Sequence, residues 1–384
     1  MQLYDVYSLY PIEPVRGEGS YVFTADGERY LDFYGGHAVI SVGHAHPHYV
    51  KLISEQVARL GFYSNSVENP LQQELADKLG RLSGLDDYSL FLVSSGAEAN
   101  ENALKLASFR TGRRRVIAFR GGFHGRTSAA VNATDNEGIK APINRNYPVT
   151  FLELNDLDAL ARELKKGDVA AVIIEGIQGI GGIHIPEKDY LEALPGLCHA
   201  NGTLLILDEV QSGYGRSGKF FAFQHCDVRP DIVTVAKGMG NGFPIGGVLI
   251  APEIPAQKGQ LGTTFGGSHL ACAAGIAVLD IMENEDLIGN ADRQGEYLRH
   301  ALEETGLFTN VRGQGLMIGL DMDEPIGELR KRLLFEHRVF TGSAKDPNTI
   351  RLLPPLNVTR EACEVVIDAF QEALVAGGQS GKNH

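Results

Sequence analysis

One lysine of the chain stands directly after an apolar run. Lys237 follows Ile232–Val235, with only Ala236 between them, and glycines occupy positions 238, 240 and 242. Most lysines lie on solvated faces. A poorly hydrated amine at the end of a strand has a lowered pKa and can attack a carbonyl carbon. The alternative is a side chain that only extends its amine into solvent.

A carboxylate ends another apolar run. Asp208 follows Thr203–Leu207, and Glu209 comes next. Ligands of open α/β sheets bind beyond the carboxyl ends of the strands, and a buried charge is costly without a partner. Asp208 is therefore a candidate site residue. The alternative is an aspartate whose oxygens accept only from backbone N–H groups of the following loop.

The third segment with possible chemistry is a helix start. Ser94-Ser95-Gly96 separates an apolar run at Ser89–Val93 from a helical pattern over Ala97–Ser108. Unpaired backbone N–H groups at such a start suit an anion such as phosphate, whereas a serine there also serves as an ordinary N-cap.

These three features are more informative together than singly. A phosphate cradle, a buried carboxylate and a strand-end amine are the parts that hold pyridoxal phosphate. In such a site the lysine forms a Schiff base with the cofactor, and the carboxylate keeps the pyridine nitrogen protonated. The sequence therefore predicts pyridoxal 5'-phosphate as a cofactor.

The elements that must position these residues alternate between short β-branched runs and helical periodicity. Residues 47–267 are expected to form a large α/β domain with a mostly parallel sheet. Residues 268–384 read as a smaller α+β domain that residues 1–46 join. The other expected strands are Val116–Phe119, Val169–Glu175, Gly247–Ile250, Val311–Asp323 and Thr349–Leu353. The other expected helices are Tyr190–Ala200, His269–Asn284, Leu287–Thr305 and Arg360–Ala376, before a polar tail from Gly377 that is expected to fray.

The composition excludes several classes of protein. The chain has 384 residues with 35 basic and 48 acidic side chains, a net charge of −13, which argues against a nucleic-acid partner. No apolar run approaches the roughly 20 residues of a membrane helix, and residues 1–13 do not resemble a signal peptide. Four widely spaced cysteines favour reduced thiols in a cytoplasmic protein. No metal site is expected, because His44-x-His46-x-His48 reads as the entry to a helix.

A longer motif gives a family resemblance. The segment Leu207–Gly218 (LDEVQSGYGRSG), followed by Lys237, resembles class III pyridoxal-phosphate aminotransferases of the acetylornithine/ornithine branch. The resemblance extends from Tyr30–Phe33 to Ile350–Pro355. It implies the fold type I architecture of pyridoxal-phosphate-dependent transferases, with a large and a small domain.

The resemblance also implies roles around the cofactor ring. Lys237 would hold the cofactor and later carry a proton, and Asp208 would pair with the pyridinium nitrogen. Gln211 would hydrogen-bond the ring hydroxyl. Phe123 would stack on the ring, with His124 beside it.

By the same resemblance, Ser95, Gly96 and Ala97 would hold the phosphate. Thr264 would reach the phosphate of a neighbouring subunit. That role implies a homodimer whose active sites are shared between subunits.

Two arginines and one loop bear on the substrate. Arg351 resembles the family's anchor for an α-carboxylate and Arg126 the anchor for the far carboxylate, a task that suits the guanidinium fork; ordinary surface ion pairs are the alternative. The loop that begins at Glu175 is also expected to contact substrate. Family members often carry a glutamate where this chain has Ile180. We therefore expect Arg351 to be more exposed here, and an acyl donor with its own carboxylate to satisfy it.

The resemblance implies transfer of an ω-amine to 2-oxoglutarate, with small-molecule substrates and no nucleic-acid or membrane partner. N-acetylornithine is the expected donor, which would place the enzyme in arginine biosynthesis. N-succinylornithine, ornithine and 4-aminobutyrate aminotransferases remain alternatives, and an aminomutase is a distant one. A nicotinamide-dependent dehydrogenase would also explain a glycine-rich α/β chain, but it would have no cofactor-bound lysine.

Overall fold

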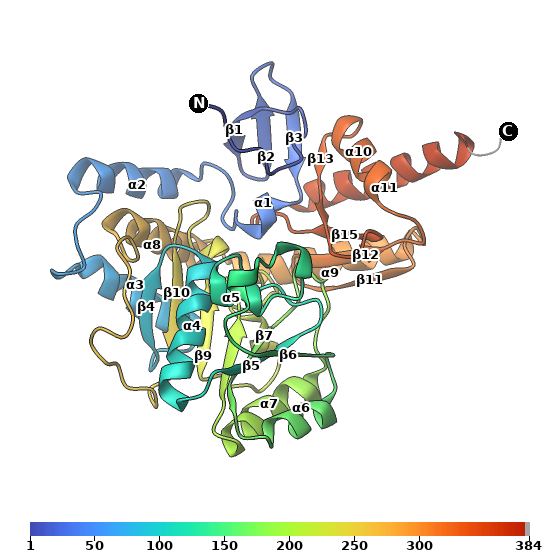
Figure 1. Cartoon of the computed structure of the whole chain (residues 1–384). Coiled ribbons are helices and arrows are strands. Elements are labelled where there is room, and N and C mark those ends of the chain that lie inside the picture. Colours follow the sequence, from blue (N-terminus) through green and yellow to red (C-terminus); the bar gives the residue numbers. More distant parts are fainter. Residues whose placement is uncertain (381–384) are drawn as a thin grey trace.

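A seven-stranded sheet forms the centre of the molecule (Figure 1). The computed structural model describes residues 1–380, and the side chains of residues 1–374. In spatial order the strands are β4 (Ser89–Val93), β10 (Gly246–Ile250), β9 (Ile232–Val235), β8 (Leu204–Asp208), β7 (Val169–Glu175), β5 (Arg115–Phe119) and β6 (Val149–Leu152). β10 runs antiparallel to both of its neighbours, and every other pair in this sheet is parallel. The expected α/β class with a mostly parallel sheet is confirmed.

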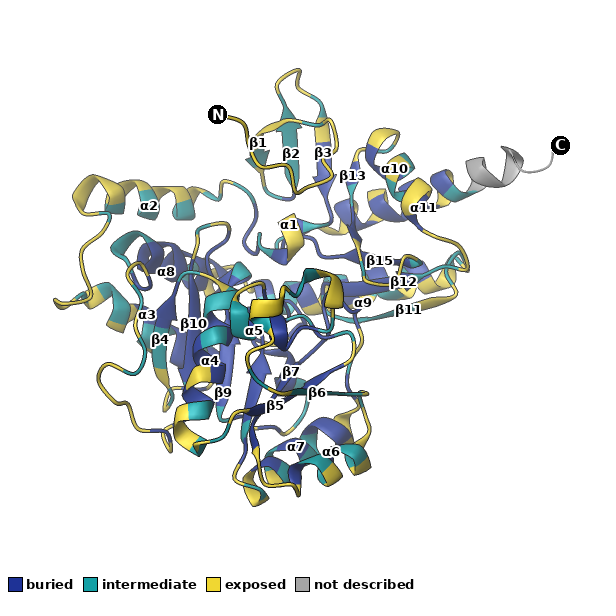
Figure 2. Ribbon diagram, viewed as in Figure 1, coloured by how far each residue is buried: buried dark blue, intermediate teal, exposed yellow. Residues whose placement is uncertain are grey.

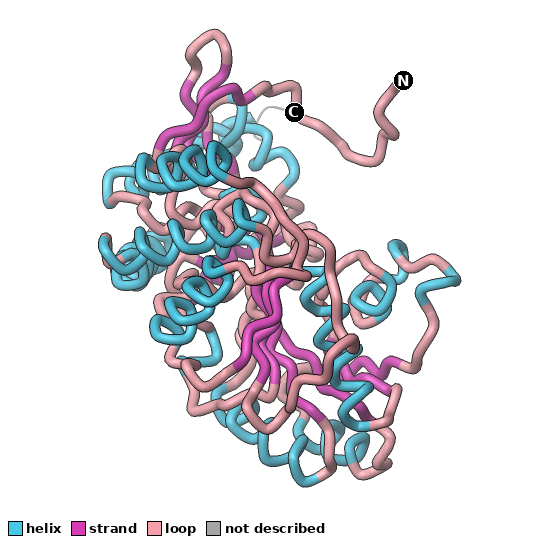
Figure 3. Tube along the Cα trace, turned by 90° about the vertical axis from the view of Figure 1, so that its left-hand side faces the viewer, coloured by secondary structure: helices cyan, strands magenta, loops and turns pink. Residues whose placement is uncertain are grey.

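Side chains that alternate along the strands divide the interior into two cores. Along β7, Val172 and Ile174 belong to one core, and Ala171 and Ile173 belong to the other. Both faces of the sheet are covered, which is why the strands are continuous apolar runs. Figure 2 shows the central strands buried, and Figure 3 shows helices on both sides of them.

The helices of this part of the chain cover the sheet from both faces. They are α2 (Pro47–Arg59), α3 (Pro70–Ser83), α4 (Gly96–Thr111), α5 (Ser128–Asn132), α6 (Leu157–Leu164), α7 (Lys188–Ala200) and α8 (His269–Asn284). α4 contacts five of the strands, β4 and β7 to β10. Its buried face carries Ala99, Ala103 and Ala107, and these small side chains let the helix lie close to the sheet. α8 packs against α2 and α3, whereas the predicted boundary at residue 267 placed it in the second domain; the domain boundaries stay a prediction.

Outside the large sheet the chain forms two smaller sheets, and the two ends of the chain meet in one of them. The first has the order β1-β2-β3-β13 and the second β11-β12-β15-β14. β13 pairs in parallel with β3, so a strand near the N-terminus is bonded to a C-terminal one. The elements are β1 (Pro14–Glu18), β2 (Tyr21–Thr24), β3 (Arg29–Asp32), α1 (Gly35–Ala38), α9 (Leu287–Glu304), β11 (Asn310–Gln314), β12 (Met317–Asp321), α10 (Gly327–Phe335), β13 (Val339–Phe340), β14 (Gly342–Ser343), β15 (Thr349–Leu352) and α11 (Arg360–Ser380).

Two expectations about the C-terminal part were wrong. The single strand expected over Val311–Asp323 is a hairpin of β11 and β12. The chain reverses at Gly315, where φ is 53° and an added Cβ would lie 2.4 Å from the carbonyl carbon of Ser217, so only glycine fits this turn. The final helix, expected to end at Ala376, continues as α11 to Ser380, and the rest of the tail that was expected to fray falls outside the described residues.

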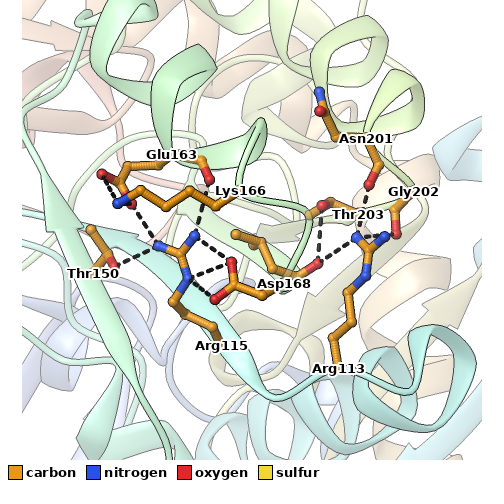
Figure 4. A network of polar contacts seen from close by, with 10 residues as sticks. Arg113, Arg115, Thr150, Glu163, Lys166, Asp168, Asn201, Gly202 and Thr203 are labelled. Atoms are coloured by element: carbon orange, nitrogen blue, oxygen red, sulfur yellow. Dashed lines mark hydrogen bonds and ion pairs between the residues drawn. The ribbon is translucent and has the colours of Figure 1, made fainter.

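The amino-terminal edge of the large sheet is closed by a polar network (Figure 4). Arg113 donates to the carbonyl oxygens of Val169, Asn201 and Gly202 at 2.8–3.1 Å. Arg115 at the start of β5 uses all five of its N–H donors. Its acceptors are the Asp168 carboxylate, the Thr150 hydroxyl, and the carboxylate and carbonyl oxygens of Glu163.

The three histidines near α2 do not face a common point. His44, His46 and His48 point to three different carboxylates, those of Asp32, Glu285 and Asp280. Within residues 1–380, no three His, Cys, Asp or Glu side chains are grouped so that they could hold a metal ion. None of the helices in this part of the chain has the length and apolarity needed to cross a membrane.

Candidate active site

The carboxyl edge of the large sheet brings the predicted residues together. The strand register aligns Glu175 of β7 with Asp208 of β8, and Asp208 with Thr234 of β9. Lys237 follows β9 by two residues and reaches the same edge. These side chains, except Thr234, line a cavity of about 370 Å³ that also has walls from Ser95, Gly96, Ala97, Asn100, Phe123, His124, Arg126, Ile180, Gln211 and Phe243.

Lys237 is held in an uncommon backbone conformation. Its φ is 47°, in the left-handed region that side chains other than glycine rarely adopt. A short 3-10 turn, Lys237–Met239, fixes it through hydrogen bonds from Met239 N to Ala236 O and from Gly240 N to Lys237 O. Strain of this kind is commonly retained at functional sites. Within the described residues the lysine amine has no hydrogen-bond partner, and burial lowers its pKa to about 8.

Asp208 has one open position on its carboxylate. Oδ2 accepts from Asn100 Nδ2 and from His124 Nδ1, both at 2.7 Å, and Oδ1 accepts from Val210 N at 3.0 Å. An ionised carboxylate has about four lone-pair positions. Three are used by these donors, so one remains on Oδ1 for an N–H group of a ligand.

The neighbours of Asp208 share its electrostatic environment. Burial opposes the charged form of His124, but the hydrogen bond and negative charge of Asp208 outweigh it and raise the pKa of the imidazole. Burial raises the pKa of Glu175 to about 7. Both Glu175 oxygens accept from backbone N–H groups, Oε1 from Phe123 and Oε2 from Gly179, at 2.9 and 2.8 Å. Glu175 thus holds in place the backbone of Phe123 and the loop that carries Ile180. A contact of Glu175 with the substrate stays a prediction.

The start of α4 offers unpaired donors to the cavity. Ser95 is the N-cap, and its Oγ accepts from Glu98 N at 3.1 Å, so the N-cap interpretation holds. The N–H groups of Gly96 and Ala97 lie before the first intrahelical bond, which joins Ala99 N to Ser95 O. A Cβ at position 96 would lie 2.6 Å from Val210 Cγ1. Glycine at this position therefore lets the helix start approach the end of β8.

The expected exposure of Arg351 is wrong. Arg351 is only 1% exposed in the middle of the C-terminal sheet. Its Nε donates to Ser343 O at 2.7 Å and its Nη1 to Gln211 Oε1 at 3.0 Å. Ile180 offers no acceptor, but Gln211, whose Oε1 lies against the neighbouring Gly179, supplies one. Arg351 is therefore connected to the cavity wall through Gln211 and does not itself line it.

The other expected residues fall in two groups. Phe123, Arg126 and Ile180 line the cavity, with Arg126 exposed at its mouth. Thr264 is exposed and outside the cavity walls of its own subunit. Asn100 and Phe243 also line the cavity but were not predicted from the sequence. The signal available for Asn100 was an asparagine between Ala99 and Ala103 in the apolar pattern of the helix, and we find no signal for Phe243.

The comparisons with known proteins agree with this geometry. The family model for aminotransferase class III matches residues 5–374. The chain belongs to this family. It is 40% identical to the acetylornithine aminotransferase of Archaeoglobus fulgidus over 92% of this chain and 93% of that one. It is 37% identical to that of Bacillus subtilis over 97% of both.

Solved structures of aminotransferases share the fold. Acetylornithine aminotransferase from Elizabethkingia anophelis superimposes with a TM-score of 0.83 at 30% identity, over 96% of this chain and 95% of that one. Ornithine aminotransferase from Toxoplasma gondii superimposes with a TM-score of 0.91 at 28% identity, over 97% and 92%. The chain is therefore an aminotransferase of fold type I that uses pyridoxal 5'-phosphate.

The residues present fit this cofactor. The N–H groups of Gly96 and Ala97 suit its phosphate, the open position on Asp208 suits its ring nitrogen, and the unpaired amine of Lys237 suits its aldehyde. When bound, the cofactor supplies a carbonyl carbon to which an amine adds and a ring that takes up electron density. The protein supplies an amine with a lowered pKa that can add to a carbon or accept a proton. Phe123 provides a flat apolar surface.

Proposed function

We propose that this aminotransferase moves the ω-amine of N-acetylornithine to 2-oxoglutarate, and that it acts in arginine biosynthesis. The observation that carries this proposal is the cavity in which the Lys237 amine, the Asp208 carboxylate and the start of α4 converge, with Arg126 at the mouth. N-acetylornithine carries one free amine and one carboxylate. Arg126 can bind that carboxylate while the amine reaches Lys237. The relatives that are about 40% identical support the choice of donor.

For 2-oxoglutarate and glutamate, which carry two carboxylates, both arginines have a task. Arg126 binds the far carboxylate, and Arg351 binds the α-carboxylate. Since Gln211 Oε1 now accepts from Arg351 at 3.0 Å, the substrate carboxylate takes the place of this neutral acceptor. A charged acceptor forms the stronger hydrogen bond with a guanidinium. Arg351→Lys removes the fork but keeps the charge, so it should lower kcat/KM for 2-oxoglutarate by about 100-fold.

The experiment that tests the donor is a panel of four amines with 2-oxoglutarate: N-acetylornithine, N-succinylornithine, ornithine and 4-aminobutyrate. The expected result is the highest kcat/KM for N-acetylornithine. N-succinylornithine is the second candidate, because Ile180 leaves an apolar cavity wall where the family often has a glutamate. A preference for ornithine or 4-aminobutyrate, or turnover without 2-oxoglutarate, would contradict the proposal.

We also propose a homodimer with shared active sites. Large apolar side chains are exposed beside the cavity at Phe62, Tyr63 and Phe265, and a second pocket lined by Phe62 and Phe265 shares Ser94, Phe243 and Pro244 with it. Burial of these side chains against a second copy would also bring the neighbouring Thr264 toward the site of that copy, as its proposed phosphate contact requires. The N-terminal segment carries further exposed apolar side chains, Leu3, Tyr4, Val6, Tyr7 and Leu9.

Sedimentation equilibrium tests this assembly. The proposal predicts a dimer that Phe62→Glu together with Phe265→Glu dissociates, with loss of activity. A monomeric wild-type enzyme with full activity would contradict it. We place the enzyme in the cytoplasm, because all four cysteines are free, as is usual in a reducing compartment.

A further inference from the structure

Two buried polar side chains stand behind Asp208 in a chain of hydrogen bonds. Thr234 is fully buried in β9 and Asn100 is 1% exposed on α4. Thr234 Oγ1 donates to Asn100 Oδ1 at 2.7 Å. Asn100 Nδ2 donates to Asp208 Oδ2 at 2.7 Å and to His124 O at 2.8 Å. Thr234 is the one polar residue in the strand Ile-Val-Thr-Val, where an apolar side chain would otherwise be expected.

The direction of these bonds follows from what each group can do. The Asp208 carboxylate and the His124 carbonyl have no hydrogen to donate, so the NH₂ end of Asn100 must face both. A rotated amide would turn its own oxygen toward two acceptors. A hydroxyl that donates to Oδ1 stabilises the productive orientation and leaves no polar atom of the amide unpaired.

The pairing of β8 and β9 fixes the position of Thr234 relative to Asp208. Thr234 lies directly opposite Asp208 in the parallel register of β8 and β9, and Glu209 N donates to Thr234 O at 2.9 Å. The threonine is therefore placed by the same strand pairing that places the aspartate. Its hydroxyl acts on Asp208 only through Asn100, the residue that bridges β9 and the carboxylate.

We propose that Thr234 and Asn100 are positioning residues of the active site: the Thr234 hydroxyl sets the orientation of the Asn100 amide, which with His124 holds Asp208 so that its open Oδ1 position faces the cofactor ring. This inference rests on the proposed function of Asp208 as the partner of the ring nitrogen. Loss of the hydroxyl leaves Asn100 Oδ1 without its donor, so the productive orientation of the amide is less favoured and its hydrogen bond to Asp208 is weakened. Residues behind a binding group commonly change affinity or activity by about 10- to 100-fold.

The test compares three substitutions in the full-length enzyme. Thr234→Val keeps the shape and removes the hydroxyl, whereas Thr234→Ser keeps the hydroxyl. Thr203→Val is the matched control, since Thr203 is equally buried, at 2% exposed, but donates to Val169 O at the opposite edge of the sheet. The measurements are the dissociation constant for pyridoxal 5'-phosphate, the pH dependence of the absorbance of the bound cofactor, and kcat and KM.

Thr234→Val should weaken cofactor binding and lower kcat about tenfold, with KM for both substrates within about twofold, and shift the pH midpoint of the absorbance. Thr234→Ser and Thr203→Val should both stay near wild type. The inference is overturned if Thr234→Val matches Thr203→Val in all three measurements. It is also overturned, together with the proposed function, if the wild-type enzyme binds no pyridoxal 5'-phosphate, so the two failures differ in the wild-type result.

A second pair of variants tests the inference even if Thr234→Val fails to fold. Asn100→Ala removes the bridge itself. Asn102→Ala, on the same helix, removes a buried amide that donates only to Glu98 O. The inference predicts weaker cofactor binding for Asn100→Ala alone, and equal affinities of the two variants would overturn it.

Discussion

At the amino-terminal edge of the large sheet, Arg115 uses all five of its donors on acceptors of the same chain, and Arg113 caps three carbonyl oxygens (Figure 4). At the carboxyl edge of the same sheet, the Lys237 amine has no partner among the described residues. Asp208 keeps one position open there, and two N–H groups at the start of α4 stay unpaired. The first edge is complete without a ligand and the second is not. The difference distinguishes charged side chains that stabilise the fold, Arg113 and Arg115, from charged side chains that are free to bind a substrate or cofactor, Lys237 and Asp208.

The largest effect that this comparison predicts concerns Lys237. Lys237→Ala removes the amine that binds the cofactor and moves the proton, so the rate of amino transfer should fall by at least about 10⁴-fold. The free energy of unfolding of the apoenzyme should not decrease, because the lost side chain is a half-buried amine without a hydrogen bond. Single-turnover kinetics and urea unfolding measure the two quantities. A large loss of stability together with residual activity would contradict the assignment of the carboxyl edge as the active site.

The opposite result is expected at Arg115. Arg115→Met leaves Glu163 and Asp168 without their shared partner, and should lower the free energy of unfolding by about 2 kcal/mol, reduced by the partial exposure of Asp168. The kcat of the folded enzyme should stay within about twofold. Urea unfolding with parallel activity assays checks this, and a catalytic defect without destabilisation would remove the distinction between the edges.

The lowered pKa of Lys237 predicts that the free energy of unfolding depends on pH. The pKa of Lys237 is lowered by burial to about 8, below the roughly 10.4 of a free lysine. Between these values the unfolded chain binds more protons at this residue than the native chain, so stability gains from this residue as pH rises. Relative to Lys237→Met, the free energy of unfolding of the wild-type apoenzyme should rise by at most about 1.4 kcal/mol per pH unit from pH 8 to 10. A flat difference would mean that the lysine is hydrated.

The smallest effect is expected within the amino-terminal network itself. Lys166 pairs with Glu163 at 2.8 Å, but its side chain is 58% exposed. Lys166→Ala should change the free energy of unfolding by less than about 0.5 kcal/mol. It is the matched control for Arg115→Met, since both substitutions remove a cation from Glu163. Equal effects of the two would show that burial of the arginine is not what stabilises this edge.

Site residues that directly follow an apolar run could be located from the sequence, whereas the surroundings of the other site residues could not. Asp208 and Lys237 end short apolar runs that are typical of buried strands, and the ends of parallel strands meet at one edge. The burial of Arg351 was not predictable in this way, because it depends on Gln211, an acceptor from a distant loop. The loop beginning at Glu175 was predicted to contact substrate, which stays a prediction; the backbone donors of both Glu175 oxygens were not predicted, because only the folded loop brings Phe123 N and Gly179 N to them.

The strands too could be predicted only where the local sequence pattern determines them. Buried strands of the large sheet were predicted to within two residues, because a strand covered on both faces is apolar along its whole length and its ends are marked by the first polar residues. The β11–β12 hairpin was read as one strand, although Gly313-Gln314-Gly315 was a turn signal within it. The role of Thr234 was missed because a threonine is also a good strand former, and only the pairing with β8 places it opposite Asp208.

The most direct test of the account is to reduce the enzyme with borohydride in the presence of pyridoxal 5'-phosphate and map the modified peptide by mass spectrometry. The expected result is one phosphopyridoxyl group per chain, attached to Lys237, and none in Lys237→Ala. Modification of another lysine in the wild-type enzyme, or no modification at all, would contradict the assignment of the carboxyl edge as the active site.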